Sequence, residues 1–286
     1  MVLFRLIIFL IPLAFLVGCD APSQNSSSTT PHKGLVALPA LLIIQEAISE
    51  LVPVVDGQRN DMMMSQVCAL ARGESTQEQV EQKLLKHGIN LENVPRQGHP
   101  FSLLVSSDPL SRTTACAAYV ATSVMTFPEV REFMSEDKSG VSDSKTGGKL
   151  TVDPKKLHRF LGVQLAVARA DADFFALLAT KLESTPGLTL EQYKKSAQGL
   201  FAKVALSYLR RIKSLYADGQ SRQYSLLEYS GNYFRFASND GFLFAYGHDG
   251  LYLKFNQVSW YGAGKILGKK YMLDVAYFDR ELAGSL

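Results

Sequence analysis

The sequence has few of the residues and motifs that usually reveal catalytic chemistry. Its 286 residues include five histidines, three cysteines and one tryptophan, and no two histidines have the spacing of zinc ligands. A Gly-x-Ser-x-Gly nucleophile motif is absent. The glycine-rich stretch 262–268 has Ile266 where a phosphate-binding loop needs Ser or Thr, and Leu267 where a dinucleotide loop needs Gly. We therefore expect a protein that is not an enzyme and that holds no metal and no cofactor.

An excess of charge of one sign is also missing. Lys and Arg number 30 against 27 Asp and Glu, and charged residues make up 20% of the chain. Because a nucleic-acid binder concentrates positive charge, this balance argues against a nucleic-acid partner. Hydrophobic residues make up 47% of the chain, which is enough for one or two domains with a sizeable core.

The first residues form an export signal. Arg5 is followed by an apolar run over residues 6–17, which is shorter than the roughly 20 residues of a transmembrane helix. The run ends in Leu16-Val17-Gly18-Cys19, which resembles the lipobox of bacterial lipoproteins. The resemblance covers residues 1–19. It implies cleavage before Cys19, attachment of lipid chains such as palmitate to that cysteine, and stable tethering to a membrane.

Under the same resemblance, Asp20 indicates the membrane in which the lipoprotein resides. In enterobacteria and their relatives, an aspartate directly after the lipidated cysteine retains a lipoprotein in the inner membrane, facing the periplasm. The outer membrane is the alternative address, and in a bacterium with one membrane Asp20 would only open a polar linker. Residues 20–33 are rich in Ser, Thr and Pro and have no large apolar side chain, so they predict a flexible leash.

Composition divides the chain into successive segments. We expect a signal peptide at 1–18, a lipidated linker at 19–33, a helical region at 34–134, a loop at 135–150, a helical hairpin at 151–218 and a β region at 219–286. The sequence thus predicts an α+β fold. In it, an N-terminal helical region and a long helical hairpin precede a C-terminal antiparallel β-meander.

Periodic apolar residues predict helices over 34–55, 61–72, 77–87 and 113–125. Pro39 suits the first turn of the first helix, and Ser75 with Glu78 matches a capping box at the start of the third. Glu46 and Glu50 share one face of the first helix. A solvated face explains these two carboxylates, and a catalytic pair is the alternative.

The cysteine count fits an exported protein. With Cys19 lipidated, Cys68 and Cys116 remain as an even pair in an oxidising compartment. We expect a disulfide between them, which would stabilise the fold by about 4 kcal/mol in the chain-entropy model. Two buried free thiols are the alternative.

Two long helices follow, joined by a short connection that makes them an antiparallel hairpin. Asp153 before Pro154 predicts the N-cap and first turn of one helix, and Thr189 with Gln192 predicts a capping box for the other. Basic residues lie on the outer side of the second helix, at Lys194, Lys195, Lys203, Arg210, Arg211 and Lys213. We interpret them as a solvated face, with a surface for an acidic partner as the alternative.

Aromatic and β-branched residues alternate between turn signals in the last part of the chain. The expected strands span 224–229, 233–237, 242–246, 251–255, 258–261 and 271–278, in a meander of five or six strands. Asn-Asp-Gly at 239–241 and Asp-Gly at 249–250 are typical of hairpin turns. One face of this sheet must cover a core, which leaves about half of the aromatic side chains for the other face.

Such surplus Tyr and Trp residues indicate a protein-binding surface. Trp260 and Tyr261, beside the glycine-rich turn 262–264, are the leading candidates for partner contact, although Trp260 fits a core anchor equally well. We therefore expect a protein partner in the periplasm. An immunity protein against a periplasm-acting toxin is the first interpretation, by analogy with such lipoproteins. The alternatives are an accessory subunit of an envelope-spanning secretion, pilus or conjugation machine, and an envelope hydrolase with an unrecognised site.

Replacing the lipobox cysteine tests the anchor. The Cys19→Ser protein should take up no fatty-acid analogue and should leave the membrane fraction, because the sulfur that carries the lipid is gone. Metabolic labelling and fractionation measure both effects. If the variant stays with the bilayer while the wild-type protein takes up no label, the apolar segment from Gly34 is the anchor instead.

Overall fold

The computed structural model describes residues 35–124, 127–136, 150–183, 185, 188–247, 250–255, 258–262, 265–266 and 275–279. For residues 35–39, 183 and all those from 250 onward, the description covers the backbone alone. The predicted α+β fold is confirmed: helices and a long hairpin precede an antiparallel meander. Cys19 and Asp20 lie outside the described residues.

The first segment differs from the single helix expected over 34–55. Residues Leu35–Pro39 form strand β1, and helix α1 spans only Ala40–Ser49. Strand β1 pairs antiparallel with β12, Val275–Asp279, near the other end of the chain. After α1, strands β2 (Val54–Val55) and β3 (Gln58–Arg59) form a small hairpin. Its turn residues, Asp56 and Gly57, have positive φ angles, which are typical of a two-residue Asp-Gly hairpin turn.

The rest of the helical region begins with α2 (Asp61–Ala71) and α3 (Gln77–Leu85). The capping box of α3 is Thr76 with Gln79, one residue later than predicted, because both pairs of residues fit the motif. The 3₁₀ turn η1 (Leu91–Asn93) and the short helix α4 (Ser102–Val105) follow. Helix α5 spans Pro109–Ser123 and starts earlier than expected, since Asp108 caps it by accepting from the Leu110 amide at 2.9 Å.

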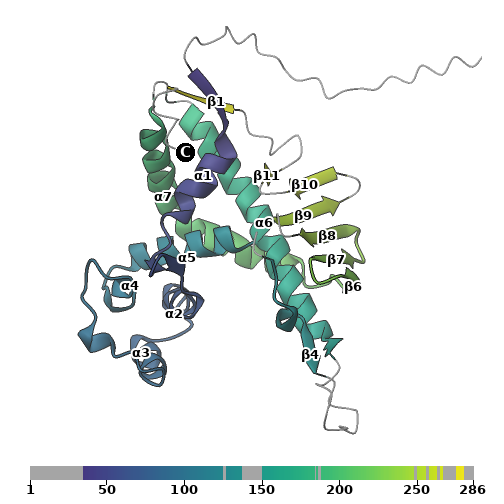
Figure 1. Cartoon of the computed structure of the whole chain (residues 1–286), viewed down its shortest axis with the longest axis horizontal. Helices are drawn as coiled ribbons and strands as arrows, with labels where there is room; N and C mark the ends of the chain where they lie inside the picture. Colours follow the sequence, from purple (N-terminus) through teal and green to yellow (C-terminus); the bar gives the residue numbers. More distant parts are fainter. Residues whose placement is uncertain are drawn as a thin grey trace, which may run out of the picture.

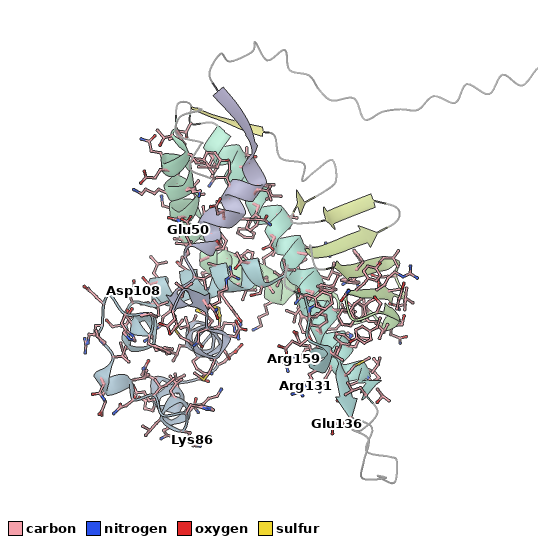
Figure 2. The ribbon with its side chains drawn as sticks, in the orientation of Figure 1. Glu50, Lys86, Asp108, Arg131, Glu136 and Arg159 are labelled. Atoms are coloured by element: carbon pink, nitrogen blue, oxygen red, sulfur yellow. A yellow bond between two sulfur atoms is a disulfide. The ribbon has the colours of Figure 1, made fainter. Side chains whose placement is uncertain are left out.

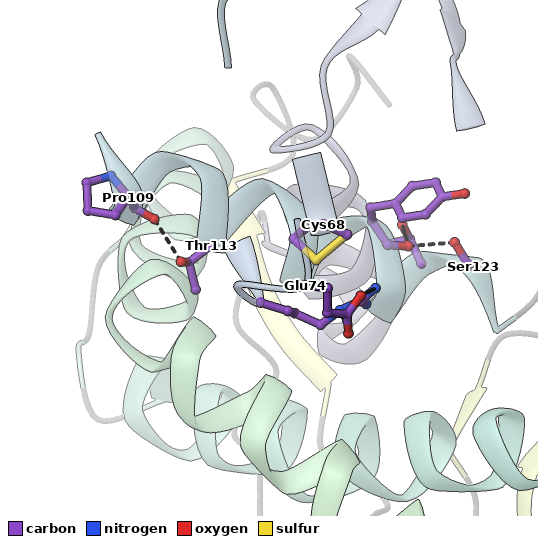
Figure 3. Close-up of a disulfide and its surroundings, with 9 residues drawn as sticks. Cys68, Glu74, Pro109, Thr113 and Ser123 are labelled. Carbon is purple, nitrogen blue, oxygen red and sulfur yellow. Dashed lines mark hydrogen bonds and ion pairs between the residues drawn. A yellow bond between two sulfur atoms is a disulfide. The ribbon is translucent and has the colours of Figure 1, made fainter. Parts of the chain in front are cut away.

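A disulfide joins α2 to α5 (Figure 3). Its cysteines, Cys68 and Cys116, are separated by 48 residues in the sequence and are both buried. Helix α5 also hydrogen-bonds within itself near each end. The Thr113 hydroxyl donates to the Pro109 carbonyl at 2.7 Å, and the Ser123 hydroxyl donates to the Tyr119 carbonyl at 2.6 Å.

The long hairpin consists of α6 (Pro154–Glu183) and α7 (Leu190–Asp218). The predicted capping box of α7 is present, with Thr189 and Gln192 each accepting from the other's backbone amide. Asp153 Oδ1 accepts from the amides of Lys155 and Lys156 at the start of α6. Helix α6 crosses the middle of the molecule, with α1 and α7 on one side and the meander on the other (Figure 1).

The predicted loop at 135–150 begins and ends in paired strands. After the 3₁₀ turn η2 (Val130–Glu132), strand β4 (Met134–Glu136) pairs antiparallel with β5 (Leu150–Val152). Each strand has only three residues, too few for a periodic pattern to be visible in the sequence. Residues 137–149 lie outside the described residues.

The meander is a six-stranded sheet in the order β11-β10-β9-β8-β7-β6. Its strands are β6 (Tyr224–Tyr229), β7 (Tyr233–Ser238), β8 (Phe242–Gly247), β9 (Gly250–Phe255), β10 (Val258–Gly262) and β11 (Lys265–Ile266). The last strand expected for this sheet, over 271–278, is instead β12, which pairs with β1. A local pattern identifies a strand, but it does not identify a partner far away in the sequence.

Phe133 connects the parts of the core that meet beside the sheet. It is fully buried, and its ring makes edge contacts with Phe234 and Phe236 of β7, with centroids 5.1 and 5.3 Å apart. The ring of Phe160 on α6 lies 5.7 Å away. These contacts belong to one continuous cluster of buried residues that extends through α1, α2, α5, α6, α7 and the sheet.

The disulfide can be tested on the mature exported protein. Mass spectrometry without reduction should find a linked pair of peptides containing Cys68 and Cys116. The double variant Cys68→Ala, Cys116→Ala should lower the free energy of unfolding by up to about 4 kcal/mol, since the crosslink restricts the unfolded chain. Alkylation of both thiols in native, unreduced protein would contradict the bond.

Truncating Phe133 tests whether its ring holds the sheet to α6. Phe133→Ala should lower the free energy of unfolding by about 3–5 kcal/mol, because it leaves a cavity among buried rings. Denaturant titration measures the change. The control Leu110→Ala removes a side chain that is 60% exposed and should change stability by no more than about 0.5 kcal/mol. Equal effects of the two substitutions would rule out this role for Phe133.

Candidate protein-binding surface

Most of the aromatic residues of β6, β7 and β8 pack against the rest of the molecule, although Tyr229 is still 47% exposed. In β6, β7 and β8 the rings on the core side belong to Tyr224, Tyr229, Phe234, Phe236, Phe242, Phe244 and Tyr246. Tyr229 stacks on its register partner Phe234 with centroids 4.6 Å apart, and Tyr246 lies 5.8 Å from Phe160 of α6. The expectation that half of the aromatic side chains are free is therefore wrong for these three strands.

The opposite side of the same three strands carries mainly small and aliphatic residues. We call it the outer face and define it by Ser225, Leu227, Tyr233, Arg235, Ala237, Leu243 and Ala245. Leu227 is 48% exposed and Leu243 is 39% exposed. Arg235 Nε lies 3.7 Å from Glu228 Oε2, and about half of each of the two side chains is exposed to solvent. The outer face thus exposes apolar area that a protein partner could cover.

A bulge shapes the edge of the outer face. The register between β6 and β7 shifts between Leu226 and Glu228, so Leu227 is the additional residue of the edge strand. A bulge bends and twists its strand, and it interrupts the row of backbone groups to which another strand could add. The geometry therefore favours a partner that packs against side chains over one that extends the sheet.

Trp260 and Tyr261 lie in β10, at the far side of the sheet from β6. Tyr261 is the register partner of Leu253 in β9 and of Ile266 in β11. The register shifts between Ser259 and Tyr261, which makes Trp260 the bulged residue. The described part of this strand is its backbone, so contact of the two side chains with a partner stays a prediction.

Glu46 and Glu50 both contact residues of α7. Lys194 Nζ lies 2.8 Å from Glu46 Oε1 and 3.6 Å from Glu50 Oε1, and the amide of Gln198 donates to Glu50 Oε2 and to the Ala47 carbonyl. Burial lowers the pKa of Lys194, but the hydrogen bond and charge of Glu46 and the charge of Glu50 outweigh it and raise that pKa. These contacts join α1 to α7 on the side where Figure 2 labels Glu50.

The basic residues of α7 are distributed between ion pairs and solvent. Besides Lys194, Lys195 pairs with Glu191 one turn earlier at 2.7 Å, and Arg211 pairs with Asp173 of α6 at 3.1 Å. Lys203, Arg210 and Lys213 are exposed. Several of these positive charges are thus balanced within the molecule, as expected for a solvated face.

A polar cluster between α2 and α5 was not anticipated from the sequence. The Tyr119 hydroxyl donates to Asp61 Oδ1 at 3.0 Å, and burial together with this carboxylate raises the pKa of Tyr119 to about 12. Burial also raises the pKa of the nearby Glu132. A hydroxyl with so high a pKa remains protonated and acts as a donor, so the cluster fits a structural link between helix ends rather than a nucleophile with its base.

A shallow pocket of about 380 Å³ lies between α3 and η1. Glu78, Glu81 and Glu92 line it together with Leu85 and Ile89. Glu78 hydrogen-bonds to Thr76, which lowers the pKa of its carboxyl, and Glu81 accepts from Gln77 at 3.0 Å. Two of the three carboxylates therefore form hydrogen bonds with the N-cap or the first residue of α3.

Among the described residues, no three His, Cys, Asp or Glu side chains gather closely enough to hold a metal ion. None of the described helices combines the length and the apolar character needed to cross a bilayer. The sequence matches no protein-family model, and neither the curated proteins nor the solved structures yielded a significant match.

Proposed function

We propose that this chain is a lipoprotein of the inner membrane whose folded part binds another protein in the periplasm. The lipobox-like segment at residues 16–19 and Asp20 support the address. The leash over residues 20–33 would allow the folded part to reach a partner near the membrane, at no more than about 3.3 Å per residue.

The outer face of the sheet is the observation that carries the binding proposal. Its two leucines expose much of their apolar area, and the small side chains of Ala237 and Ala245 adjoin Leu243, the first across the register on β7 and the second two residues along β8. Exposed apolar patches are typical of protein-protein contacts, and Arg235 on the middle strand β7 adds a charge within this one. In the backbone register of the next strand, β9, Lys254 pairs with Leu243 and Tyr252 pairs with Ala245.

The partner that we propose is a folded toxin that acts in the periplasm, and this chain is its immunity protein. An inhibitor of this kind needs one exposed contact surface on a stable scaffold, and the continuous core provides that scaffold. Tethering keeps the inhibitor at the membrane, where an effector that degrades membrane or cell wall acts. The bulged edge strand fits a partner that docks by its side chains.

Charged substitutions on the outer face test the proposal. A photo-crosslinking amino acid at position 237 of the full anchored protein, opposite Leu243 in the register, should capture the partner in cells, and Leu227→Glu with Leu243→Glu should abolish that capture. Each leucine at a hot spot contributes about 1 kcal/mol or more, so each single substitution should weaken binding at least about fivefold. Tyr261→Ala should also weaken binding if the interface extends to β10.

The matched control is Leu206→Glu on α7. Leu206 is 48% exposed, as Leu227 is, so the control introduces the same charge at an equally exposed leucine away from the sheet. The captured protein should be toxic when it is exported to the periplasm alone. The wild-type chain and the control should neutralise this toxicity, and the double variant should not. A captured protein that is harmless, or that belongs to a secretion or pilus machine, would overturn the immunity role.

A further inference from the structure

Asp171 is a carboxyl group buried in the middle of the helical hairpin. It lies on α6 with no exposed surface, and its Oδ1 accepts a hydrogen bond from the Tyr208 hydroxyl of α7 at 2.5 Å. Its Oδ2 is also shielded from solvent and has no hydrogen-bond partner among the described residues. An ionised carboxylate with one donor and no counter-ion is very unfavourable in such a place.

Among the residues that the structure describes, no buried positive charge compensates Asp171. On α7 the buried groups that titrate are Tyr193 and Tyr208. The buried residues of α1 and α5, which also pack on α6, are apolar side chains, two threonines and the disulfide half Cys116. Tyr224 of β6 and the pair Arg131 and Glu132 of η2 lie on the elements at the sheet side of the helix.

The charged residues that flank Asp171 in the sequence are partly exposed to solvent. Arg211 of α7 pairs with Asp173, the residue two positions after Asp171, and both partners are partly exposed. Arg169, two positions before Asp171, is also partly exposed. Aromatic rings surround the Tyr208 side of the contact, since the rings of Phe174 and Phe201 each lie 5.5 Å from the Tyr208 ring.

We propose that Asp171 and Tyr208 form a proton-dependent latch across the α6–α7 contact. In the closed hairpin the carboxyl carries its proton and is neutral, with the tyrosine hydroxyl bound to Oδ1. Loss of the proton places an uncompensated charge between two helices that otherwise bury apolar side chains, and the helices separate locally until water reaches it. The latch is independent of the outer face and of any partner.

Burial is the main cause of the proton's retention, since it raises the pKa of Asp171 well above the ordinary value of an aspartate, while the Tyr208 hydrogen bond opposes this effect. The folded state therefore binds more protons than the unfolded state in the window between the two pKa values. The contribution of Asp171 to the free energy of unfolding is fully present at pH values below its pKa in the unfolded chain. It is lost as the pH rises toward the pKa of Asp171 in the folded protein. Within this window each pH unit raises the unfolding constant roughly tenfold.

The experiment compares hydrogen exchange in the full mature chain, held in nonionic detergent, from mildly acidic to mildly alkaline pH. After correction for intrinsic exchange, amides of α6 and α7 around Asp171 and Tyr208 should lose protection in the wild-type protein as pH rises. Asp171→Asn, which cannot ionise, should show protection that does not change with pH. Asp218→Asn is the control, since it removes an exposed carboxylate of α7, and it should behave as the wild type does.

Parallel pH dependence in the wild type and in Asp171→Asn would overturn the latch. Should the asparagine variant fail to fold, infrared spectroscopy of the wild-type protein provides the second test. At neutral pH the spectrum should contain the carbonyl band of an undissociated carboxylic acid in a dry environment, and Tyr208→Phe should shift that band. Absence of the band in the folded wild type would equally overturn the proposal.

Discussion

The burial of α6 on opposite sides is the constraint on which the rest of the structure depends. Leu161 and Ala170 are nine residues apart, so they point in opposite directions from the helix axis, yet neither is exposed. A helix that buries side chains on opposite sides must be covered by other elements on both of those sides. Helix α7 and α1 cover one side of α6, and the sheet approaches from the other (Figure 1). The hairpin and the meander are therefore joined through a shared helix.

Different interactions secure the two sides of α6. On the sheet side, aromatic rings meet at edges and faces around Phe133, which gives large buried area with defined geometry. On the hairpin side, charged and amide groups at the margin join α1 to α7 through Lys194 and Gln198. The margin contacts are partly exposed and contribute little energy, so they position helices that apolar packing already stabilises.

Local sequence signals predict the helices and strands whose ends are determined by residues adjacent to them in the chain. Thr189 with Gln192 and Asp153 before Pro154 identified the hairpin helices, and alternation with Asn-Asp-Gly turns identified the strands from Tyr224 to Gly247. The segment 35–39 is apolar in a way that suits a helix or a strand, and its pairing with residues 275–279 decided the outcome. Distant pairing of this kind has no local signature.

The candidate surface was only partly visible from the sequence. Alternation placed two faces on the meander, but it could not tell which of them α6 covers, and most described rings turned out to lie on the covered face. Asp171 was also invisible, because an aspartate within a helix is normally solvated, and only the position of Tyr208 on the facing helix reveals its burial.

The short β4–β5 pair brings together two points of the chain that are distant in the sequence. Register places Glu136 opposite Leu150. Since the cost of closing a loop grows only slowly with its length, insertions between these two residues should be accommodated without disturbing Phe133 or α6. Related chains could therefore vary freely in length here. For the same reason the site offers a place to graft an epitope or a fluorescent reporter into the anchored protein.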